Sequence, residues 1–294
     1  MTADPARGFH DGELAVQQRA GVARDAARLA GMLGPTRLRP GSTAFLAGLR
    51  LAALTARDRA GTLWISVLTG PPGFLDGAGE LLRIRAAPVP GDPLSDLGAD
   101  QPVGIVAIDP QARRRMRVNG TLISARPGSL VVEVGEAYGN CPQYIQERTI
   151  GTGPTRRTEH PAPLVGDRLD ESATRIVRAA DTFFLGTIHP ERGADASHRG
   201  GPAGFVQVAG GDLAWPDYPG NNMFNSLGNL QVDDTAALAF VDFGTGDTVQ
   251  LSGRAHVEWA DPGPADDDGG TGRRVVFTVS RVVSGGPPLP IRAA

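Results

Sequence analysis

The sequence predicts a mainly β protein with a few helices, built from two similar domains in tandem. The stretch from Ser66 to Leu75 (Ser-Val-Leu-Thr-Gly-Pro-Pro-Gly-Phe-Leu) recurs 131 residues later as Ser197 to Val206 (Ser-His-Arg-Gly-Gly-Pro-Ala-Gly-Phe-Val). A second pair, Arg117–Gly120 and Gln250–Gly253, is offset by 133 residues. These offsets are too long for a solenoid repeat and suit a duplicated domain.

Short apolar segments with β-branched residues, separated by Gly and Pro, predict the strands. No regular alternation of strands with helices follows, which argues against a doubly wound Rossmann domain and favours an antiparallel barrel or sandwich. In the first half these segments are Leu63–Val67, Leu81–Ile84, Val103–Ile108 and Leu130–Val134, and in the second half Phe183–Ile188, Asp195–His198, Phe205–Val208, Leu213–Trp215, Ala237–Asp242, Thr248–Leu251, Arg254–Trp259 and Val275–Val279.

Helices are expected at two places, each before a set of strands. Residues 11–33 form an amphipathic pattern, with Asp11 as candidate N-cap and Gly34-Pro35 as the stop, and a shorter helix is expected at 171–180. Residues 149–168 lack an apolar period and predict a linker. The expected organisation is a helical segment at 1–40, a first, degenerate domain at 41–148, a linker at 149–169, and a second domain at 170–294 that makes the main cofactor contacts.

Composition excludes several function classes. All 29 basic residues among the 294 are Arg, so a lysine Schiff base or P-loop lysine is excluded, and any phosphate must be held by Arg, backbone N–H groups, Asn or hydroxyls. The net charge of −3 gives no reason to expect nucleic acid. No apolar run is long enough to span a membrane, and the single Cys141 fits a reducing compartment, so a cytoplasmic protein is expected. The reactivity of Cys141 is left open.

The densest polar cluster lies between Tyr218 and Leu230, where a Pro-Gly turn precedes an Asn-rich helical pattern. Unpaired N–H groups at such a helix start make a natural phosphate site, and the alternative is a capped helix without a ligand. The residues concerned are Asn221, Asn222, Asn225 and Ser226.

A second candidate site is Ser197-His198-Arg199-Gly200, where a strand runs into a Gly-rich turn that lets a ligand approach the backbone. Arg199 could pair with a phosphate or a ring oxygen, and His198 could donate to a ring edge or a substrate. The alternative is a salt-bridged Arg beside a strand-end His. The five histidines are too scattered to nominate a metal site, and no dinucleotide, Walker A or nucleophile-elbow motif occurs.

In combination these residues resemble the pyridoxamine 5′-phosphate oxidase-like flavoproteins, whose fold is the FMN-binding split β-barrel. Residues 170–260 present the family's elements in order, including Asp195–Gly201, Gly220–Ser226 and the strand that ends Gly253-Arg254-Ala255. Asn140–Ile145 is similar to a G-N-C-P-x-x-I element seen in many members.

The resemblance implies two tandem split β-barrels that form an intrachain pseudo-dimer, with FMN in the crevice between them. It implies hydride or electron transfer between the flavin and an unidentified small molecule, with a nicotinamide as possible electron donor and His198 as candidate catalytic residue. Cofactor contacts are expected from Ser197, His198, Arg199, Gly200, Asn221, Asn222, Asn225, Ser226, Thr248 and Gln250.

Two departures from the family limit the resemblance. The basic residue expected near Asn222 is absent, which weakens the phosphate assignment, and the C-terminal segment that binds pyridoxal phosphate in the true oxidases is absent as well. A true pyridoxamine 5′-phosphate oxidase is therefore not expected. FAD, a deazaflavin or haem are the alternative cofactors, a non-enzymatic flavin-binding module is the alternative function, and the chain is expected as a monomer or a homodimer.

Overall fold

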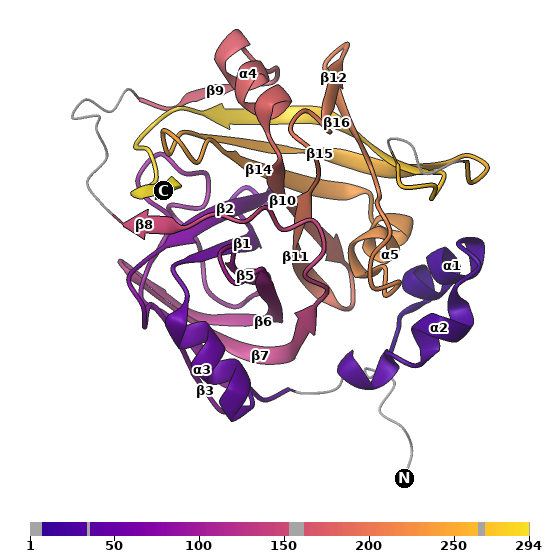
Figure 1. Ribbon diagram of the computed structural model, residues 1–294. Coiled ribbons are helices and arrows are strands. Elements are labelled where there is room, and N and C mark those ends of the chain that lie inside the picture. The colour runs from indigo at the N-terminus through magenta and orange to yellow at the C-terminus, as the bar shows by residue number, and fades with distance from the viewer. Residues whose placement is uncertain (1–7, 34–35, 153–161, 264–267, 294) are drawn as a thin grey trace.

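Two antiparallel sheets with the same strand order form the body of the protein (Figure 1). The computed structural model describes residues 8–33, 36–152, 162–263 and 268–293. The first sheet has the order β2-β1-β5-β6-β7-β4-β3, and its strands are β1 (Leu51–Arg57), β2 (Leu63–Thr69), β3 (Leu75–Ala78), β4 (Leu81–Ile84), β5 (Gln101–Asp109), β6 (Arg114–Arg126) and β7 (Ser129–Asn140). The second has the order β11-β10-β14-β15-β16-β13-β12, and its strands are β10 (Thr182–His189), β11 (Gly193–Gly200), β12 (Gln207–Ala209), β13 (Asp212–Pro216), β14 (Thr235–Val241), β15 (Thr248–Trp259) and β16 (Arg273–Ser284).

The strand order confirms the predicted duplication, because β1 to β7 correspond one by one to β10 to β16. Equivalent bulges interrupt the β6–β7 ladder at Gly120 and the β15–β16 ladder at Gly253. A Cβ atom at Gly120 or Gly253 would lie 2.0 or 2.1 Å from a carbonyl oxygen of the facing strand. Both repeats therefore need glycine at the same point for the same steric reason.

The repeated Gly-Pro-x-Gly-Phe turns also have the same conformation. Phe74 and Phe205 each donate a backbone hydrogen bond of 3.0 Å to the carbonyl of the Pro three residues earlier. Gly73 and Gly204 precede them with φ of +89° and +84°, in the left-handed region that favours glycine. The fold is thus a tandem pair of split barrels.

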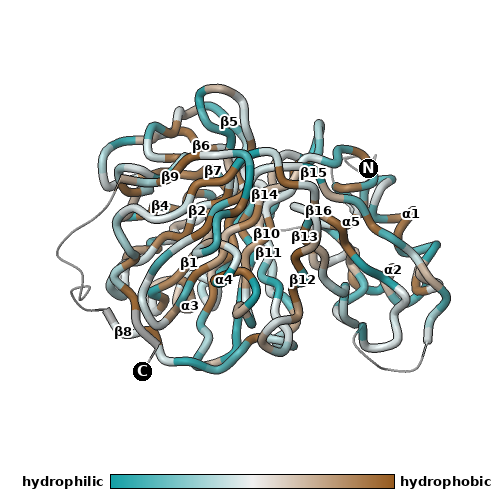
Figure 2. Tube along the Cα trace, turned by 90° about the horizontal axis from the view of Figure 1, so that it is seen from above, coloured by the Kyte–Doolittle hydropathy of each residue, from teal (hydrophilic) through white to brown (hydrophobic). Residues whose placement is uncertain are grey.

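Each half has its own apolar core, and a third apolar cluster joins the halves. Figure 2 shows that hydrophobic residues concentrate in the central strands and hydrophilic residues in the peripheral loops. The joining cluster includes Leu51, Ile65 and Val106 from the first sheet and Phe184 and Ala239 from the second. Burial of such a continuous apolar surface holds the two sheets together as an intrachain pseudo-dimer.

The helices differ from the prediction at the N-terminus. Residues 11–33 form three short pieces instead of one helix, because Gly21 takes a left-handed φ of +71° and ends the first piece, and His10 rather than Asp11 is the N-cap. Pro40 starts a helix that the sequence pattern does not predict. The helices are α1 (Asp11–Arg19), α2 (Ala23–Ala27), the 3₁₀ turn η1 (Ala30–Leu33), α3 (Pro40–Gly48), α4 (Glu171–Ala179) and α5 (Asn225–Val232).

Short strands also occur in the segment expected as a linker, although its residues 153–161 lie outside the described part of the chain. Strand β8 (Ile150–Thr152) pairs with the C-terminal β17 (Ile291–Ala293), and β9 (Leu164–Gly166) pairs with β16. Of the helices in the described ranges, none has the length and apolar character needed to cross a bilayer.

Candidate functional site: a crevice between the two halves

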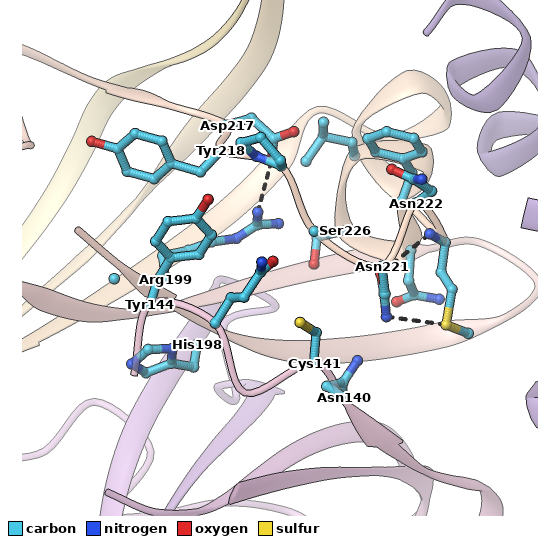
Figure 3. A pocket seen from close by; sticks show the side chains of 18 of the residues that line it. Asn140, Cys141, Tyr144, His198, Arg199, Asp217, Tyr218, Asn221, Asn222 and Ser226 are labelled. Atoms are coloured by element: carbon cyan, nitrogen blue, oxygen red, sulfur yellow. Dashed lines mark hydrogen bonds and ion pairs between the residues drawn. The ribbon is translucent and has the colours of Figure 1, made fainter. Parts of the chain in front are cut away.

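A crevice opens where β6 and β7 of the first half face β11 and α5 of the second (Figure 3). Strand residues Arg115, Arg117 and Asn140 line one side, and the connector Cys141–Tyr144 continues that wall. The enclosed part measures about 100 Å³. The residues of the second half that line it are His198, Arg199, Gly200, Phe205, Pro216, Asp217, Tyr218, Pro219, Gly220, Asn221, Asn222, Met223, Phe224, Asn225, Ser226 and Leu227.

Arg115 is the least compensated charge in this crevice. One of its terminal nitrogens donates to the Nδ1 atom and the carbonyl oxygen of His198, at 2.7 and 3.0 Å, while its Nε atom is buried without a hydrogen-bond partner among the described residues. Burial lowers the pKa of Arg115 to about 9, and the charges of Arg117 and Arg199 act in the same direction. Because no carboxylate contributes to this balance, an anion that enters the crevice would gain a charge-assisted contact.

Arg117 lies beside it and already has a partner. Its guanidinium contacts both carboxylate oxygens of Asp195 at 2.9 Å, and Asp195 also accepts from the hydroxyl of Ser226 at 3.0 Å. The pKa of Arg117 is raised because the attraction of Asp195 and the other favourable contacts together outweigh the effect of burial. This pair fixes β6 of one half against β11 of the other.

Arg199 is held in a chain of charges on the opposite side. It donates to Asp217 at 2.8 Å, and Asp217 accepts a second contact, of 2.9 Å, from Arg273. The Nε atom of Arg199 is buried without a partner in the described part of the structure. Arg199 is therefore salt-bridged, as the plainer sequence interpretation expects, yet it keeps one donor for a ligand.

His198 is neutral in this environment. It is buried, and burial together with the positive charges of Arg115, Arg148 and Arg199 keeps its pKa well below its usual value. Since arginine only donates, Nδ1 of His198 must accept the Arg115 hydrogen bond, so the proton of the neutral ring resides on Nε2.

The loop before α5 forms the remaining wall and is conformationally strained. Asn222 and Phe224 both have left-handed φ, +59° and +58°, and no side chain caps α5. Asn221 turns inward, accepting from the backbone N–H of Met223 at 3.2 Å. The first N–H groups of α5 therefore have no side-chain cap.

Helix α1 holds this loop from outside the crevice. Glu13 accepts from the Asn225 side chain at 3.2 Å, and Gln17 donates to the carbonyl of Met223 at 3.2 Å. The two helices approach closely because both carry glycine at the crossing: a Cβ on Gly12 would lie 2.2 Å from the carbonyl oxygen of Gly228.

The structure brings together most of the predicted site residues, with different roles. His198, Arg199, Gly200, Asn221, Asn222, Asn225 and Ser226 line the crevice. Ser197 does not line it, because it is buried behind the surface, where its hydroxyl lies 3.1 Å from that of Ser226. The hydroxyl of Ser226 points to Ser197 and Asp195 and is thus already engaged within the protein.

Thr248 and Gln250 are placed elsewhere, which corrects the expectation that they share one site with the other candidate residues. They line a second crevice with Val67, Leu68 and Asp92. Gln250 donates there to Ser66 and to Asp92, each at 3.0 Å. The physical reason is that β11 and β15 belong to the same half but lie at opposite crevices. The first crevice combines β11 of the second half with β6 of the first half. The second crevice combines β15 of the second half with β2 of the first half.

Sequence reasoning missed Arg115 and Arg117, although a signal was present. The 133-residue offset aligns them with Thr248 and Gln250, so the first copy carries two arginines where the second has neutral side chains. These arginines supply the basic groups that the segment around Asn222 lacks. In the described residues no group of three or more His, Cys, Asp or Glu side chains is placed to hold a metal ion.

Comparison with known proteins agrees with this fold. Residues 169–268 match the family model described as pyridoxamine 5′-phosphate oxidase. No curated protein sequence matches the chain. Residues 169–268 are thus similar to the pyridoxamine 5′-phosphate oxidase-like split-barrel family.

Solved structures resemble the chain only distantly. HupZ from Group A Streptococcus is 10% identical over 41% of this chain and 98% of its own, with a TM-score of 0.33. An FAD-binding protein from Mesorhizobium loti is 10% identical over 42% and 98%, with a TM-score of 0.30. The inhibitor of motility MotI/DgrA from Bacillus subtilis is 11% identical over 82% and 88%, with a TM-score of 0.23.

Proposed function

We propose that the crevice binds FMN, with the phosphate at Arg115 and the start of α5, and that the protein is a flavin-dependent oxidoreductase. The observation that carries this proposal is Arg115, a largely buried guanidinium that no carboxylate of the described residues neutralises. A phosphate placed there would meet a charge-assisted donor and the positive end of a helix.

The unsatisfied polar atoms support the fit. The Nε atoms of Arg115 and Arg199 and the Oδ1 atom of Asn140 are buried without hydrogen-bond partners in the described residues, and all three residues line the crevice. Buried polar atoms are nearly always paired in folded proteins, so a ligand that supplied partners to this cluster would gain hydrogen bonds. The enclosed volume of about 100 Å³ suits the phosphate end, while the rest of the cofactor would extend through the open side.

The residues of the chain would bind and orient the cofactor rather than react. When bound, FMN supplies the hydride or electron transfer itself. Arg115 and the N–H groups of α5 would hold the anion, and the Asp195–Arg117 pair would keep both walls in register. His198 holds a proton on Nε2 as a neutral donor, which makes it a candidate for a hydrogen bond to the ring or the substrate.

The reaction partners follow from this proposal. A small-molecule substrate and a nicotinamide electron donor would complete a turnover, and the intrachain pseudo-dimer lets a monomer form the whole crevice. A single cysteine suits the reducing cytoplasm, where we place the protein. FAD, a deazaflavin or haem would be the alternative cofactors, and each is identified by mass spectrometry of the group released on denaturation.

A non-enzymatic flavin-binding module is the second candidate, because His198, the imidazole that lines the crevice, stays neutral there. Turnover of bound flavin with a nicotinamide donor would separate the two functions. Absence of reduction by nicotinamide and by other donors would favour the module.

Replacing Arg115 tests the phosphate site. Titration of apo-protein with FMN and with riboflavin should show tighter binding of FMN, and Arg115→Gln should remove most of that difference. Loss of a hydrogen bond to a charged group costs about 1.5–3 kcal/mol, or roughly 10- to 150-fold in Kd.

Arg114→Gln provides the matched control, since Arg114 lies on the same strand but is exposed and packs over Phe45. This variant should keep the preference for FMN. If the wild-type protein binds riboflavin as tightly as FMN, or if both variants behave alike, Arg115 does not hold a phosphate.

A further inference from the structure

A larger cavity adjoins the crevice that Arg115 lines. It measures about 990 Å³, within the range of sites that take a whole small molecule. Tyr144, Phe205, Pro216 and Tyr218 line both spaces, so the cavity begins where the crevice ends. We call it the aromatic groove, because Tyr144, Phe205, Trp215, Tyr218 and Trp259 converge on it.

A pair of tyrosines separates the groove from the crevice. Tyr144 and Tyr218 stack with ring centroids 5.0 Å apart and an interplanar angle of 20°, and both lie beside Arg199 in Figure 3. Tyr144 has a left-handed φ of +63°, and its carbonyl oxygen lies so close to Gly200 that a Cβ there would be 2.0 Å away. The fold thus maintains a strained backbone to place this ring at the boundary.

The walls of the groove favour an uncharged ligand, because the protein already engages Asp268, Arg273 and Arg274, three of the charged side chains that line it. Arg273 pairs with Asp217 at 2.9 Å, and Arg274 donates to Gln207 at 3.2 Å. Asp268 accepts from the backbone N–H groups of Gly270 and Gly272, at 2.7 and 2.8 Å. A charged ligand would have to compete with these contacts.

Two indole N–H groups in the same walls lack acceptors. The Nε1 atoms of Trp215 and Trp259 are buried without a hydrogen-bond partner among the described residues. Tryptophan N–H groups usually find a partner when buried, so a ligand acceptor that reached either of them would satisfy it. Aromatic rings on several sides favour a planar molecule, and the orphan donors favour one with a carbonyl oxygen.

We propose that the aromatic groove binds a planar, uncharged aromatic carbonyl compound. That this compound is the substrate rests on the proposed function, because the shared tyrosine wall would place it next to a cofactor in the crevice. The binding itself does not require the cofactor.

Tryptophan emission gives a direct test. Two of the three tryptophans, Trp215 and Trp259, line the groove, whereas Trp64 is in the core of the first half. Acetonaphthone, a planar aromatic ketone, should change the emission of the apo-protein saturably. The Trp64→Phe variant should give the same Kd. Tyr218→Ala should raise the Kd at least tenfold, and Trp259→Leu provides a second variant if Tyr218→Ala fails to fold.

Matched probes test the ligand class. Naphthoate, which carries a carboxylate in place of the ketone, and ethylnaphthalene, which lacks the carbonyl oxygen, should each bind at least tenfold more weakly than acetonaphthone. No saturable change with acetonaphthone, or equal binding of all three probes, would overturn the proposal.

Repeating the titration with saturating FMN separates this proposal from the proposed function. Unchanged acetonaphthone binding in the presence of bound FMN supports a separate substrate groove. Competition between the two would show that the groove holds the flavin ring, which contradicts the inference and leaves FMN binding intact. If FMN fails to bind while acetonaphthone binds, the function fails and the groove remains.

Discussion

At the scale of residues, the crevice depends on how each buried charge is balanced. Asp195 is almost fully buried and serves three partners at once, Arg117, Asn119 and Ser226, which come from both halves. Arg199 and Arg273 share Asp217 in the same way. Arg115, by contrast, has no acid among the described residues as its partner, and for this reason we propose it as the residue that binds an anion.

Removing the Asp195 carboxylate should be strongly destabilising, because it leaves Arg117 buried and unpaired. Breaking a buried pair from one side typically costs about 3–5 kcal/mol. We expect Asp195→Ala to lower the free energy of unfolding by that amount in urea denaturation. Asp234→Ala is the control, since its pair with Arg254 is exposed and should be worth under about 1 kcal/mol. Equal effects of the two substitutions would contradict a structural role for Asp195.

At the scale of elements, helix α1 completes a site that otherwise belongs to the barrels. Glu13 and Gln17 fasten the strained loop at the start of α5, and the Gly12–Gly228 contact lets the helix come close enough to do so. Part of the N-terminal segment therefore acts on the crevice without lining it.

Docking of α1 should depend on pH through Glu13. Burial raises its pKa from 4.5 to about 7, so the docked helix prefers the protonated carboxyl. The contribution of Glu13 to docking should be fully present below pH 4.5. It should decrease as the pH rises and be lost once the pH exceeds about 7. The charged or titratable groups around it are His10, Glu136 and Arg192.

Hydrogen exchange of residues 11–19 in wild type and Glu13→Gln would measure this effect. The pKa of His10 is lowered to about 4, so its own protonation opposes docking in acid, in both proteins alike. The difference between the two proteins therefore isolates Glu13, and protection of wild type relative to the variant should fall between pH 4.5 and 7. Parallel pH profiles would show that Glu13 does not titrate in the docked helix.

At the scale of the whole molecule, the two halves share one topology, but the two crevices between them are lined by different side chains. One crevice has Arg115, Arg117 and Arg199, and the other has Thr248, Gln250 and Leu68 at the corresponding places. The segment Gly285–Pro290 also lines part of the second crevice.

This inequality predicts one cofactor per chain. The second crevice offers no arginine among its described lining residues and contains the carboxyl of Asp92, so it should not bind a phosphate. Titration of apo-protein with FMN, followed by fluorescence quenching, should reach its end point at one equivalent. Two equivalents would show that the second crevice retains a site.

The close approach of the halves makes a further prediction. A Cβ on Gly104 in β5 would lie 2.5 Å from the backbone of Asp195 in β11, so Gly104→Ala should force the sheets apart. Overpacking of this kind costs about 1–3 kcal/mol in the free energy of unfolding. Gly98→Ala, with open space around it, should be nearly neutral in the same denaturation experiment. If Gly104→Ala is equally neutral, the interface is looser than its geometry indicates.

The sequence by itself determined the duplication, the strand content and one face of the site. Repeated turns such as Gly73-Phe74 and Gly204-Phe205 are local signals, because glycine conformation and strand patterning depend on near neighbours. For the same reason the polar segment around Asn221 and Ser226 is recognisable as a candidate site from its amino-acid pattern alone. The break at Gly21 shows the limit of such patterns, since the amphipathic period continues across a residue that turns the backbone.

Only the tertiary structure decided which half completes which crevice. Arg115 and His198 are 83 residues apart, and Gln250 lies opposite Ser66 rather than Arg199. Pairing of this kind depends on how two sheets pack through their shared apolar cluster. Apolar packing is non-directional, so no short-range pattern specifies it. The missing carboxylate at Arg115 is a property of that packing, and it distinguishes the crevice that can bind an anion from its counterpart.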